Sequence, residues 1–124
     1  MSMVMEKRGV DKKTVKKYEM WLADLGPAIG SKQGGTRPVL IVSNDVGNKY
    51  APIVIGIPTT TKRKKPIPTH VYLQTVGCEI ADNSILMCEQ ITTLDKEKNL
   101  LYKLFDLPKS YVHQVTQAIG VSLA

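Results

Sequence analysis

The fold is decided by residues 37–62, RPVLIVSNDVGNKYAPIVIGIPTTTK, near the middle of the chain. Within them Arg37–Ser43 is apolar and rich in β-branched residues, so it predicts a strand, with Pro38 at its start where proline is tolerated. By composition Asn44–Tyr50 is typical of a turn. The apolar run Ile53–Ile57 predicts another strand. The stretch therefore predicts a strand, a turn and a strand.

Outward from this stretch, further short apolar segments predict strands. They are Met20–Leu25, His70–Leu73, Ser84–Thr92 and Leu100–Phe105. After them Pro108 suits the first turn of a helix, and the apolar residues up to Leu123 recur with helical spacing. We therefore expect a mainly β domain with a C-terminal α-helix. A small, strongly curved barrel is the natural way to remove exposed sheet edges at this size.

Two long loops interrupt the predicted strands. Residues 26–36, GPAIGSKQGGT, contain four glycines and one proline and cannot form a regular element. Residues 59–69 are polar and basic and are closed by Pro66 and Pro68. Long loops in compact domains are usually functional or disordered. Both loops are therefore candidate sites.

The chain length of 124 residues suits one domain. No apolar run approaches the roughly 18 to 20 residues that span a bilayer, and no apolar signal segment follows the basic N-terminus. Cys78 and Cys88 lack metal-ligand spacing, which favours reduced thiols. We therefore expect a cytoplasmic protein without membrane association.

Positive charge dominates the chain. The net charge is +6, from 17 Lys and Arg against 11 Asp and Glu, and favours a polyanionic partner. The basic residues cluster within residues 7–17 and at Lys62–Lys65. We interpret residues 1–17 as a basic extension and residues 18–124 as the domain. The extension is either a frayed tail or short surface helix, or a segment that binds phosphates.

Most familiar catalytic patterns are missing. The chain has no GxGxxG, Walker loop, HExxH or GxSxG motif. His70 and His113 are the only histidines, and we interpret each as structural, so the histidine pair of many ribonucleases lacks support. The acidic residues are separated by turns and strand rather than clustered. We therefore predict no metal and no cofactor.

Two segments that flank consecutive predicted strands remain as candidates, Gly34–Pro38 and Pro58–Lys62. Glycines let a backbone approach a bulky ligand closely. The planar fork of an arginine binds a phosphate with two hydrogen bonds, and threonine hydroxyls can donate to the same oxygens. The alternatives are a surface ion pair for Arg37 and a β-prone strand end for Thr59–Thr61.

Four segments carry a family resemblance. They are DLGPAIGSKQGGTRPVLIVSNDVGNKY (Asp24–Tyr50), IPTTTK (Ile57–Lys62), PIPTHVYL (Pro66–Leu73) and DNSILMCEQITTLDKEK (Asp82–Lys98). On these segments, and in the helix near its end, the chain resembles the MazF/PemK family of toxins from bacterial toxin–antitoxin pairs. The resemblance covers about residues 19–123, nearly the whole domain.

The resemblance implies a compact SH3-like barrel of the MazF/CcdB type that works as a homodimer. It implies a sequence-specific, ribosome-independent endoribonuclease. The family's catalytic arginine falls on Arg37, and its catalytic threonine falls on Thr60, with Thr61 as the alternative. Further RNA contacts are implied near Ser31, Gln33 and Gln90.

The chain departs from the family pattern in three segments. Tyr18–Glu19 stands where many members have an RGD-like triplet, Lys32 replaces an acidic loop residue, and the loop Lys62–Lys65 is unusually basic. We expect this loop, including Lys62, to follow the phosphates of bound RNA. Arg37 and Thr60 are retained, so the differences bear on cleavage-site preference and antitoxin pairing.

The chemistry implied by the resemblance is internal transesterification. The 2′-hydroxyl of single-stranded RNA attacks its adjacent phosphorus and expels the 5′-oxygen, which leaves a 2′,3′-cyclic phosphate and a 5′-hydroxyl. DNA lacks the 2′-hydroxyl and cannot react. The expected protein partner is a cognate MazE-like antitoxin.

Other functions are weighed against this one. A CcdB-like toxin binds DNA gyrase and cuts nothing, but the retention of Arg37 and Thr60 argues against it. A plain nucleic-acid-binding barrel stacks bases on exposed aromatics, yet aromatics are only 6% of this chain and most lie in predicted strands. An inactive toxin is the remaining alternative.

Overall fold

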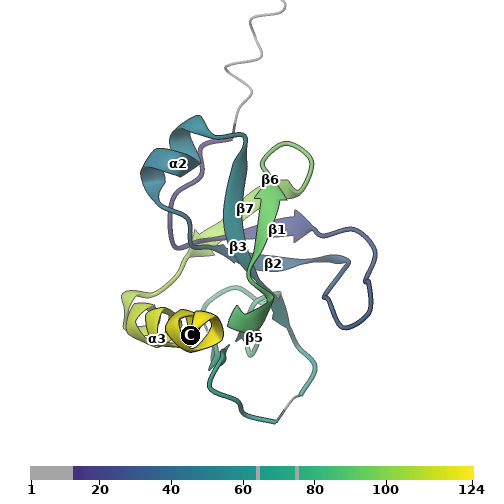
Figure 1. The fold of residues 1–124 in the computed structure, drawn as a ribbon, viewed down its shortest axis with the longest axis vertical. Helices are drawn as coiled ribbons and strands as arrows, with labels where there is room; N and C mark the ends of the chain where they lie inside the picture. The colour runs from purple at the N-terminus through teal and green to yellow at the C-terminus, as the bar shows by residue number, and fades with distance from the viewer. Residues whose placement is uncertain (1–12, 64, 75) are drawn as a thin grey trace, which may run out of the picture.

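The structure is a computed structural model that describes residues 13–63, 65–74 and 76–124. The described part of the chain contains seven strands, which form the sheet of the fold (Figure 1). They are β1 (Glu19–Asp24), β2 (Thr36–Ile41), β3 (Ile53–Thr60), β4 (His70–Tyr72), β5 (Ile85–Met87), β6 (Thr92–Asp95) and β7 (Leu100–Asp106). The helical elements are α2 (Asp45–Tyr50), η1 (Cys88–Gln90), η2 (Lys109–Tyr111) and α3 (Val112–Leu123).

The strands form one antiparallel sheet in the order β4-β5-β3-β2-β1-β7, and β6 pairs with β3 off this path. The path ends at β4 and β7, which do not pair with each other in the described part of the chain. The sheet is therefore not a closed barrel. The prediction of a mainly β domain with a C-terminal helix is confirmed.

The segment Asn44–Tyr50, expected to be a turn, is instead a short helix, α2. The Asn44 side chain accepts a hydrogen bond from the backbone N–H of Gly47 at 2.8 Å. This contact satisfies one of the unpaired N–H groups of the first helical turn. Asparagine, aspartate and glycine favour turns and helix caps alike, so composition alone did not separate the two.

The predicted strand Ser84–Thr92 is divided into β5, the 3-10 turn η1 and β6. β5 pairs with the last two residues of β3, and β6 pairs with residues 53–56 of the same strand. The two short strands thus follow one edge of β3. β3 itself runs to Thr60 rather than stopping at Ile57 as predicted.

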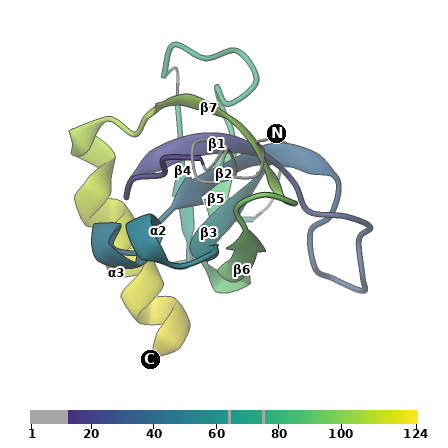
Figure 2. The same ribbon diagram turned by 90° about the horizontal axis from the view of Figure 1, so that it is seen from above.

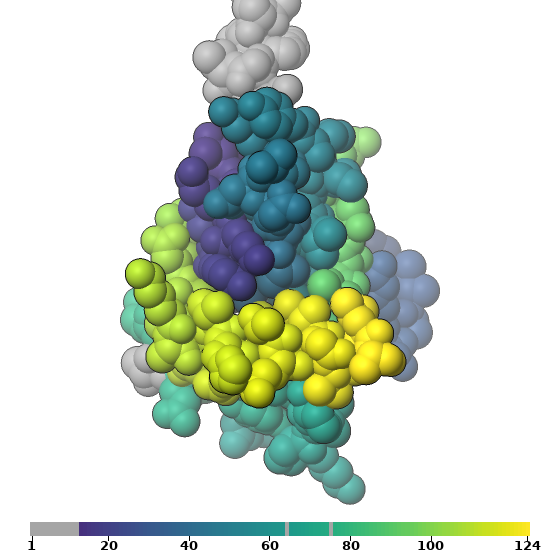
Figure 3. Space-filling model, turned by 60° about the vertical axis from the view of Figure 1, so that its left-hand side comes forward, coloured from purple at the N-terminus to yellow at the C-terminus, as the bar shows by residue number. Residues whose placement is uncertain are grey.

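The core lies on both faces of the sheet. Leu40 and Ile57 belong to a cluster that α3 covers with Val115 and Ala118. The next residue along β2, Ile41, belongs to the second cluster, because successive side chains of a strand point to opposite faces. Figure 2 shows α3 on one side of the sheet, and Figure 3 shows its outer surface lying open below α2.

A hydrogen-bond network joins α2 to β3. Asn48 is only 1% exposed. Its Nδ2 donates to the carbonyl of Ser43 at 2.9 Å and to Asp45 Oδ1 at 3.4 Å, and its Oδ1 accepts from the Ser43 hydroxyl. Ser43 Oγ also accepts from the backbone N–H of Ile55 on β3 at 3.0 Å. Asp45 accepts the backbone N–H of Lys17 at 2.7 Å.

Of the predicted extension 1–17, residues 1–12 lie outside the described residues. Val15 is buried and packs into the second core cluster. The division at residue 17 stays a prediction. Among the helices of the described residues, none has the length and apolar character needed to cross a membrane.

Candidate active site

Arg37 and Thr60 lie at the same end of two paired strands. β2 and β3 are antiparallel, with Val39 opposite Pro58, so the beginning of β2 meets the end of β3. Arg37 is the second residue of β2, and Thr60 is the last residue of β3. The sheet therefore brings together the two residues that the family resemblance implied as catalytic.

Two backbone carbonyls hold the guanidinium of Arg37. Its Nε donates to the carbonyl of Gly34 at 2.8 Å, and its Nη1 donates to that of Thr59 at 2.9 Å. These contacts fix the plane of the group. Among the described residues the side chain makes no further hydrogen bond, so the outer N–H groups remain available to a ligand.

A pocket of about 240 Å³ lies beside this arginine. It is lined by Leu22, Thr36, Arg37, Pro38, Thr59, Thr60, Thr61, Ile80 and Ser84. Both candidate threonines, Thr60 and Thr61, are in this lining. Among the described residues of the lining, Arg37 is the one charged side chain. A guanidinium beside several hydroxyls is chemistry that suits a phosphate group.

The three successive threonines of this pocket use their hydroxyls differently. Thr59 is buried, and its hydroxyl donates to the carbonyl of Pro38 at 2.8 Å. The Oγ1 of Thr60 accepts the backbone N–H of Lys62 at 3.2 Å, which leaves the hydroxyl proton for another acceptor. Thr61 is exposed. Thr60 is therefore the threonine with an oriented hydroxyl that can still donate.

The glycine-rich loop before β2 packs against itself. A Cβ on Gly34 would lie 2.3 Å from the backbone nitrogen of Ala28, so only glycine fits there. Gly35 has a positive φ of 78° and donates its N–H to the carbonyl of Gly26 at 2.6 Å. The glycines were expected to let this loop approach a ligand closely. At Gly34 the close approach is instead to the loop's own backbone at Ala28.

Three of the predicted RNA contacts, Ser31, Gln33 and Gln90, are not in the lining of this pocket and are joined by hydrogen bonds of Gln90. Its Oε1 accepts the backbone N–H of Gln33 at 2.8 Å, and its Nε2 donates to the carbonyl of Ser31 at 3.2 Å. Ser31 and Gln90 line a second, open pocket of about 540 Å³ that also includes Glu89. In this structure Gln90 anchors the glycine-rich loop, so its predicted contact with RNA bases would require these bonds to be exchanged.

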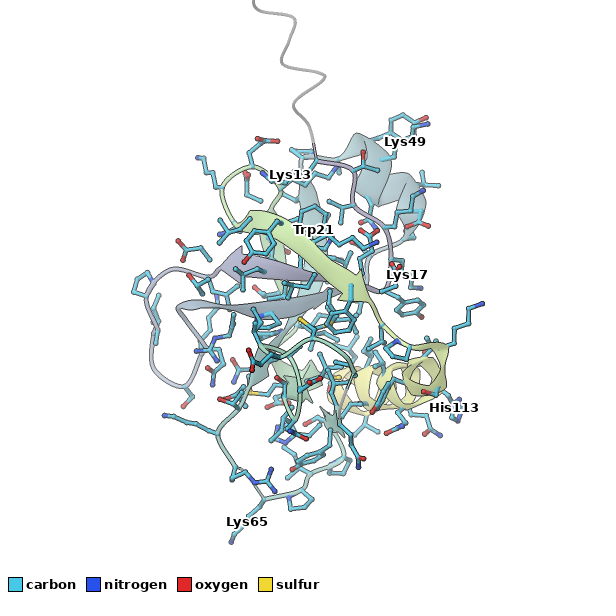
Figure 4. The ribbon with its side chains drawn as sticks, turned by 180° about the vertical axis from the view of Figure 1, so that it is seen from behind. Lys13, Lys17, Trp21, Lys49, Lys65 and His113 are labelled. Atoms are coloured by element: carbon cyan, nitrogen blue, oxygen red, sulfur yellow. The ribbon has the colours of Figure 1, made fainter. Side chains whose placement is uncertain are left out.

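The basic loop after β3 is exposed at Lys62, Arg63 and Lys65, and residue 64 is outside the described residues. Figure 4 shows Lys65 at one end of the molecule, while Lys17 and Lys49 lie toward the other. Because Lys62 follows Thr60 by two residues, the loop begins at the edge of the candidate pocket.

A second group of polar residues, not predicted from the sequence, lies where β4 begins. Glu89 accepts the hydroxyl of Thr69 at 2.9 Å and lies 3.1 Å from Nε2 of His70. Partial burial opposes ionisation of Glu89, but hydrogen bonds from its own backbone, Thr69 and His70 outweigh burial and lower its pKa. The His70 side chain is almost fully buried, in keeping with the structural role expected for it.

The two cysteines are free thiols. Burial, assisted by the negative charge of Glu89, raises the pKa of Cys88 to about 12, whereas Cys78 is partly exposed. The described residues contain no group of three or more His, Cys, Asp and Glu side chains that could hold a metal ion.

Comparisons with known proteins define the class to which this fold and site belong. A family model described as "PemK-like, MazF-like toxin of type II toxin-antitoxin system" matches residues 16–123. The chain belongs to this family. The implied resemblance is therefore confirmed.

Individual relatives narrow the class. The chain is 42% identical to Endoribonuclease MazF of Staphylococcus epidermidis over 110 residues, which are 88% of this chain and 91% of the relative. Within the toxin family, this chain is therefore an endoribonuclease.

Solved structures support the fold. An endoribonuclease from a mycobacterial species, in complex with its cognate antitoxin, superposes with a TM-score of 0.73 at 25% identity, covering 88% of this chain and 94% of its own. MazF from Deinococcus radiodurans has a TM-score of 0.75 at 21% identity, covering 90% and 97%. The expected MazF-type, SH3-like fold is confirmed by these likenesses.

Proposed function

We propose that this chain is the toxin of a type II toxin–antitoxin system and cleaves single-stranded RNA at specific sequences, without ribosomes and without a metal ion. The observation that carries the proposal is the shared pocket of Arg37 and Thr60. One guanidinium and one hydroxyl with a proton to donate can there reach the same phosphodiester. This pairing suits a reaction that needs no protein nucleophile.

The proposed reaction is a transesterification within the RNA. The 2′-oxygen forms a bond to the adjacent phosphorus, the bond from phosphorus to the 5′-oxygen breaks, and the 2′-hydroxyl proton leaves as the 5′-oxygen gains one. Negative charge builds up on the phosphorane oxygens. Because the two carbonyl contacts already orient Arg37, its outer N–H groups can stabilise this charge without reorganisation.

Thr60 has a complementary task in this proposal. Its hydroxyl oxygen is occupied by the N–H of Lys62, so its proton can be donated to a non-bridging phosphate oxygen. That bond would hold the phosphate in line for attack by the 2′-oxygen. The exposed basic loop, with Lys62, Arg63 and Lys65, would attract the neighbouring phosphates.

The proposal includes the partners and place of action expected from the sequence. In this proposal the chain forms a homodimer, acts in the cytoplasm and is neutralised by a MazE-like antitoxin. A structural neighbour was solved together with its own cognate antitoxin, which supports an antitoxin partner for this chain. The gyrase-binding alternative has no such support, because these relatives are endoribonucleases and MazF toxins.

The test is a digestion of a long, defined transcript by the purified protein in excess EDTA. We expect cuts at a small set of sequences, with 2′,3′-cyclic phosphate and 5′-hydroxyl ends, and no cleavage of DNA of the same sequence. Cleavage that disappears with EDTA and returns with a divalent ion would contradict the metal-independent reaction. An intact transcript would contradict the nuclease assignment.

A further inference from the structure

Ser84 has a buried hydroxyl without a hydrogen-bond partner. Among the described residues only two buried side-chain atoms, Ser84 Oγ and His70 Nδ1, are in this condition. Ser84 is 1% exposed and immediately precedes β5. It lines the same pocket as Arg37 and Thr60. A polar atom without a partner therefore lies in the wall of the candidate active site.

The backbone of Ser84 is held independently of its side chain. Its N–H donates to the carbonyl of Ala81 at 3.2 Å, and its carbonyl accepts the N–H of Leu73 at 2.8 Å. The hydroxyl is not needed for either bond. A buried hydroxyl without a partner destabilises the folded chain relative to an apolar group of similar size. The serine is thus unexplained by the fold alone.

Thr59 gives the internal comparison. Its side chain lines the same pocket and is equally buried. Its hydroxyl, however, donates to the carbonyl of Pro38 at 2.8 Å. Among the buried hydroxyls of this lining, those of Thr59 and Thr60 have partners within the protein, and that of Ser84 has none.

We propose that Ser84 is a substrate-binding residue whose hydroxyl donates a hydrogen bond to a phosphate oxygen of the bound RNA strand. This inference rests on the proposed nuclease function. A phosphate oxygen is a strong acceptor, and the pocket already offers it Arg37 and Thr60 as donors. Leu22 and Ile80 in the same lining supply an apolar wall against which a ribose can pack.

The first experiment uses Ser84→Ala in the full-length chain, with a short RNA that spans one mapped cleavage site. We expect kcat/KM to fall roughly 10- to 100-fold, the effect of losing a hydrogen bond to a charged group. The thermal unfolding midpoint should stay the same or rise, because the variant no longer buries an unpaired hydroxyl. Wild-type kcat/KM in a folded Ser84→Ala protein would overturn the proposal.

Ser122→Ala is the matched control. The hydroxyl of Ser122 donates to the carbonyl of Ala118 on α3 at 2.8 Å, outside the pocket. We expect this variant to cut RNA at the wild-type rate. An equal loss of kcat/KM in both variants would assign the Ser84 effect to general destabilisation and overturn the proposal.

Ser84→Cys separates the lost hydrogen bond from the lost volume. A thiol fills the site but is a weak donor, so we expect kcat/KM between those of wild type and Ser84→Ala or equal to the latter. Full activity with the thiol would show that only volume matters at this position. This variant also provides the measurement if the alanine protein does not fold.

A non-cleavable analogue with a 2′-deoxy nucleotide at the cut site identifies the atom that is bound. If Ser84 binds a phosphate oxygen, Ser84→Ala weakens binding of this analogue by about the same factor as it raises the KM for RNA. If wild type and variant bind the analogue equally, the hydroxyl contacts the 2′-position and the phosphate assignment is wrong. A wild-type protein that cuts no RNA would instead defeat the nuclease function, which distinguishes the two failures.

Discussion

Two groups of polar side chains lie at opposite ends of β3, and they differ in how completely the protein satisfies them. At the beginning of the strand, Asn48 is buried with its amide donating to Ser43 and Asp45 and accepting from the Ser43 hydroxyl. Every polar group of that side chain has a partner. The network holds α2 on the sheet and leaves nothing for a ligand.

At the other end of β3 the protein leaves hydrogen-bonding capacity open. Arg37 keeps outer N–H groups, Thr60 keeps its hydroxyl proton, and the Ser84 hydroxyl has no partner among the described residues. Because unsatisfied buried groups are costly, they persist where something other than stability selects them. The comparison separates a completed network, which holds α2 on the sheet, from a pocket whose donors are free to bind a ligand.

The largest expected effect comes from the candidate pocket at the end of β3, where hydrogen-bonding groups are free to bind a ligand. Arg37→Ala removes the one charged group of the pocket lining, and we expect the rate of RNA cleavage to fall about 100- to 1000-fold, as when a preorganised donor is lost. Single-turnover cleavage of a short RNA measures the effect. Arg37→Lys keeps the charge but loses the fixed fork, so a wild-type rate in the lysine variant would show that orientation is unimportant.

A pair of variants in the same pocket decides between Thr60 and Thr61. Thr60→Val removes a hydroxyl whose oxygen is already oriented by Lys62, and we expect roughly a 10- to 100-fold loss of kcat/KM. Thr61→Val changes an exposed side chain and should have a smaller effect on the same assay. The opposite ranking would move the catalytic role to Thr61, the alternative left open by the sequence.

At the beginning of β3, where the Asn48 network is complete, the expected loss is in stability. Asn48→Ala leaves the Ser43 groups and Asp45 without their buried partner, and we expect the free energy of unfolding to fall by about 1–3 kcal/mol. Urea unfolding followed by tryptophan fluorescence measures the change. Activity per folded molecule should stay at the wild-type level. A large loss of kcat/KM in the folded variant would contradict the division between structural and binding networks.

Sequence patterns predicted the strands well where each strand pairs along its whole length. Met20–Leu25 and Arg37–Ser43 match β1 and β2 to within two residues. The segment Ser84–Thr92 was predicted less well, because one apolar run serves two strands and a 3-10 turn. Local periodicity cannot reveal where a partner strand ends.

The site was only partly accessible from sequence. The resemblance pointed to Arg37 and Thr60, and the antiparallel register of β2 and β3 places both at one end. No pattern indicated Ser84, since an unpaired hydroxyl can be recognised only when its surroundings are known. For Gln90 the sequence implied a base contact, whereas the bonds to Gln33 and Ser31 depend on a loop 57 and 59 residues away in the chain.

A smaller effect, on RNA binding, is expected from the basic loop next to the candidate pocket. Replacing Lys62, Arg63 and Lys65 by glutamine should weaken RNA binding mainly at low salt. For single-stranded RNA, the slope of log affinity against log salt should fall by about 0.7 for each phosphate that the loop no longer neutralises. Binding titrations at several salt concentrations measure it. An unchanged slope would show that the loop does not bind phosphates.

The smallest expected effect concerns the group formed by Thr69, His70 and Glu89. The folded pKa of Glu89 is lowered below 4.5, so its stabilising contribution is present above that value and is lost as the pH falls through the folded pKa. Glu89→Gln should therefore lose less stability than wild type as the pH falls below 4.5. Parallel pH-dependent melting curves would contradict this.

Cys88 is buried and its pKa is raised, whereas Cys78 is partly exposed. The natural sequence can therefore be labelled selectively at one thiol. Alkylating reagents react with thiolates, and a thiol with a pKa of about 12 inside the core offers none near neutral pH. A fluorescent maleimide will therefore attach at Cys78 alone. That position is two residues before Ile80 in the pocket lining, so the label attaches next to the candidate site in the chain.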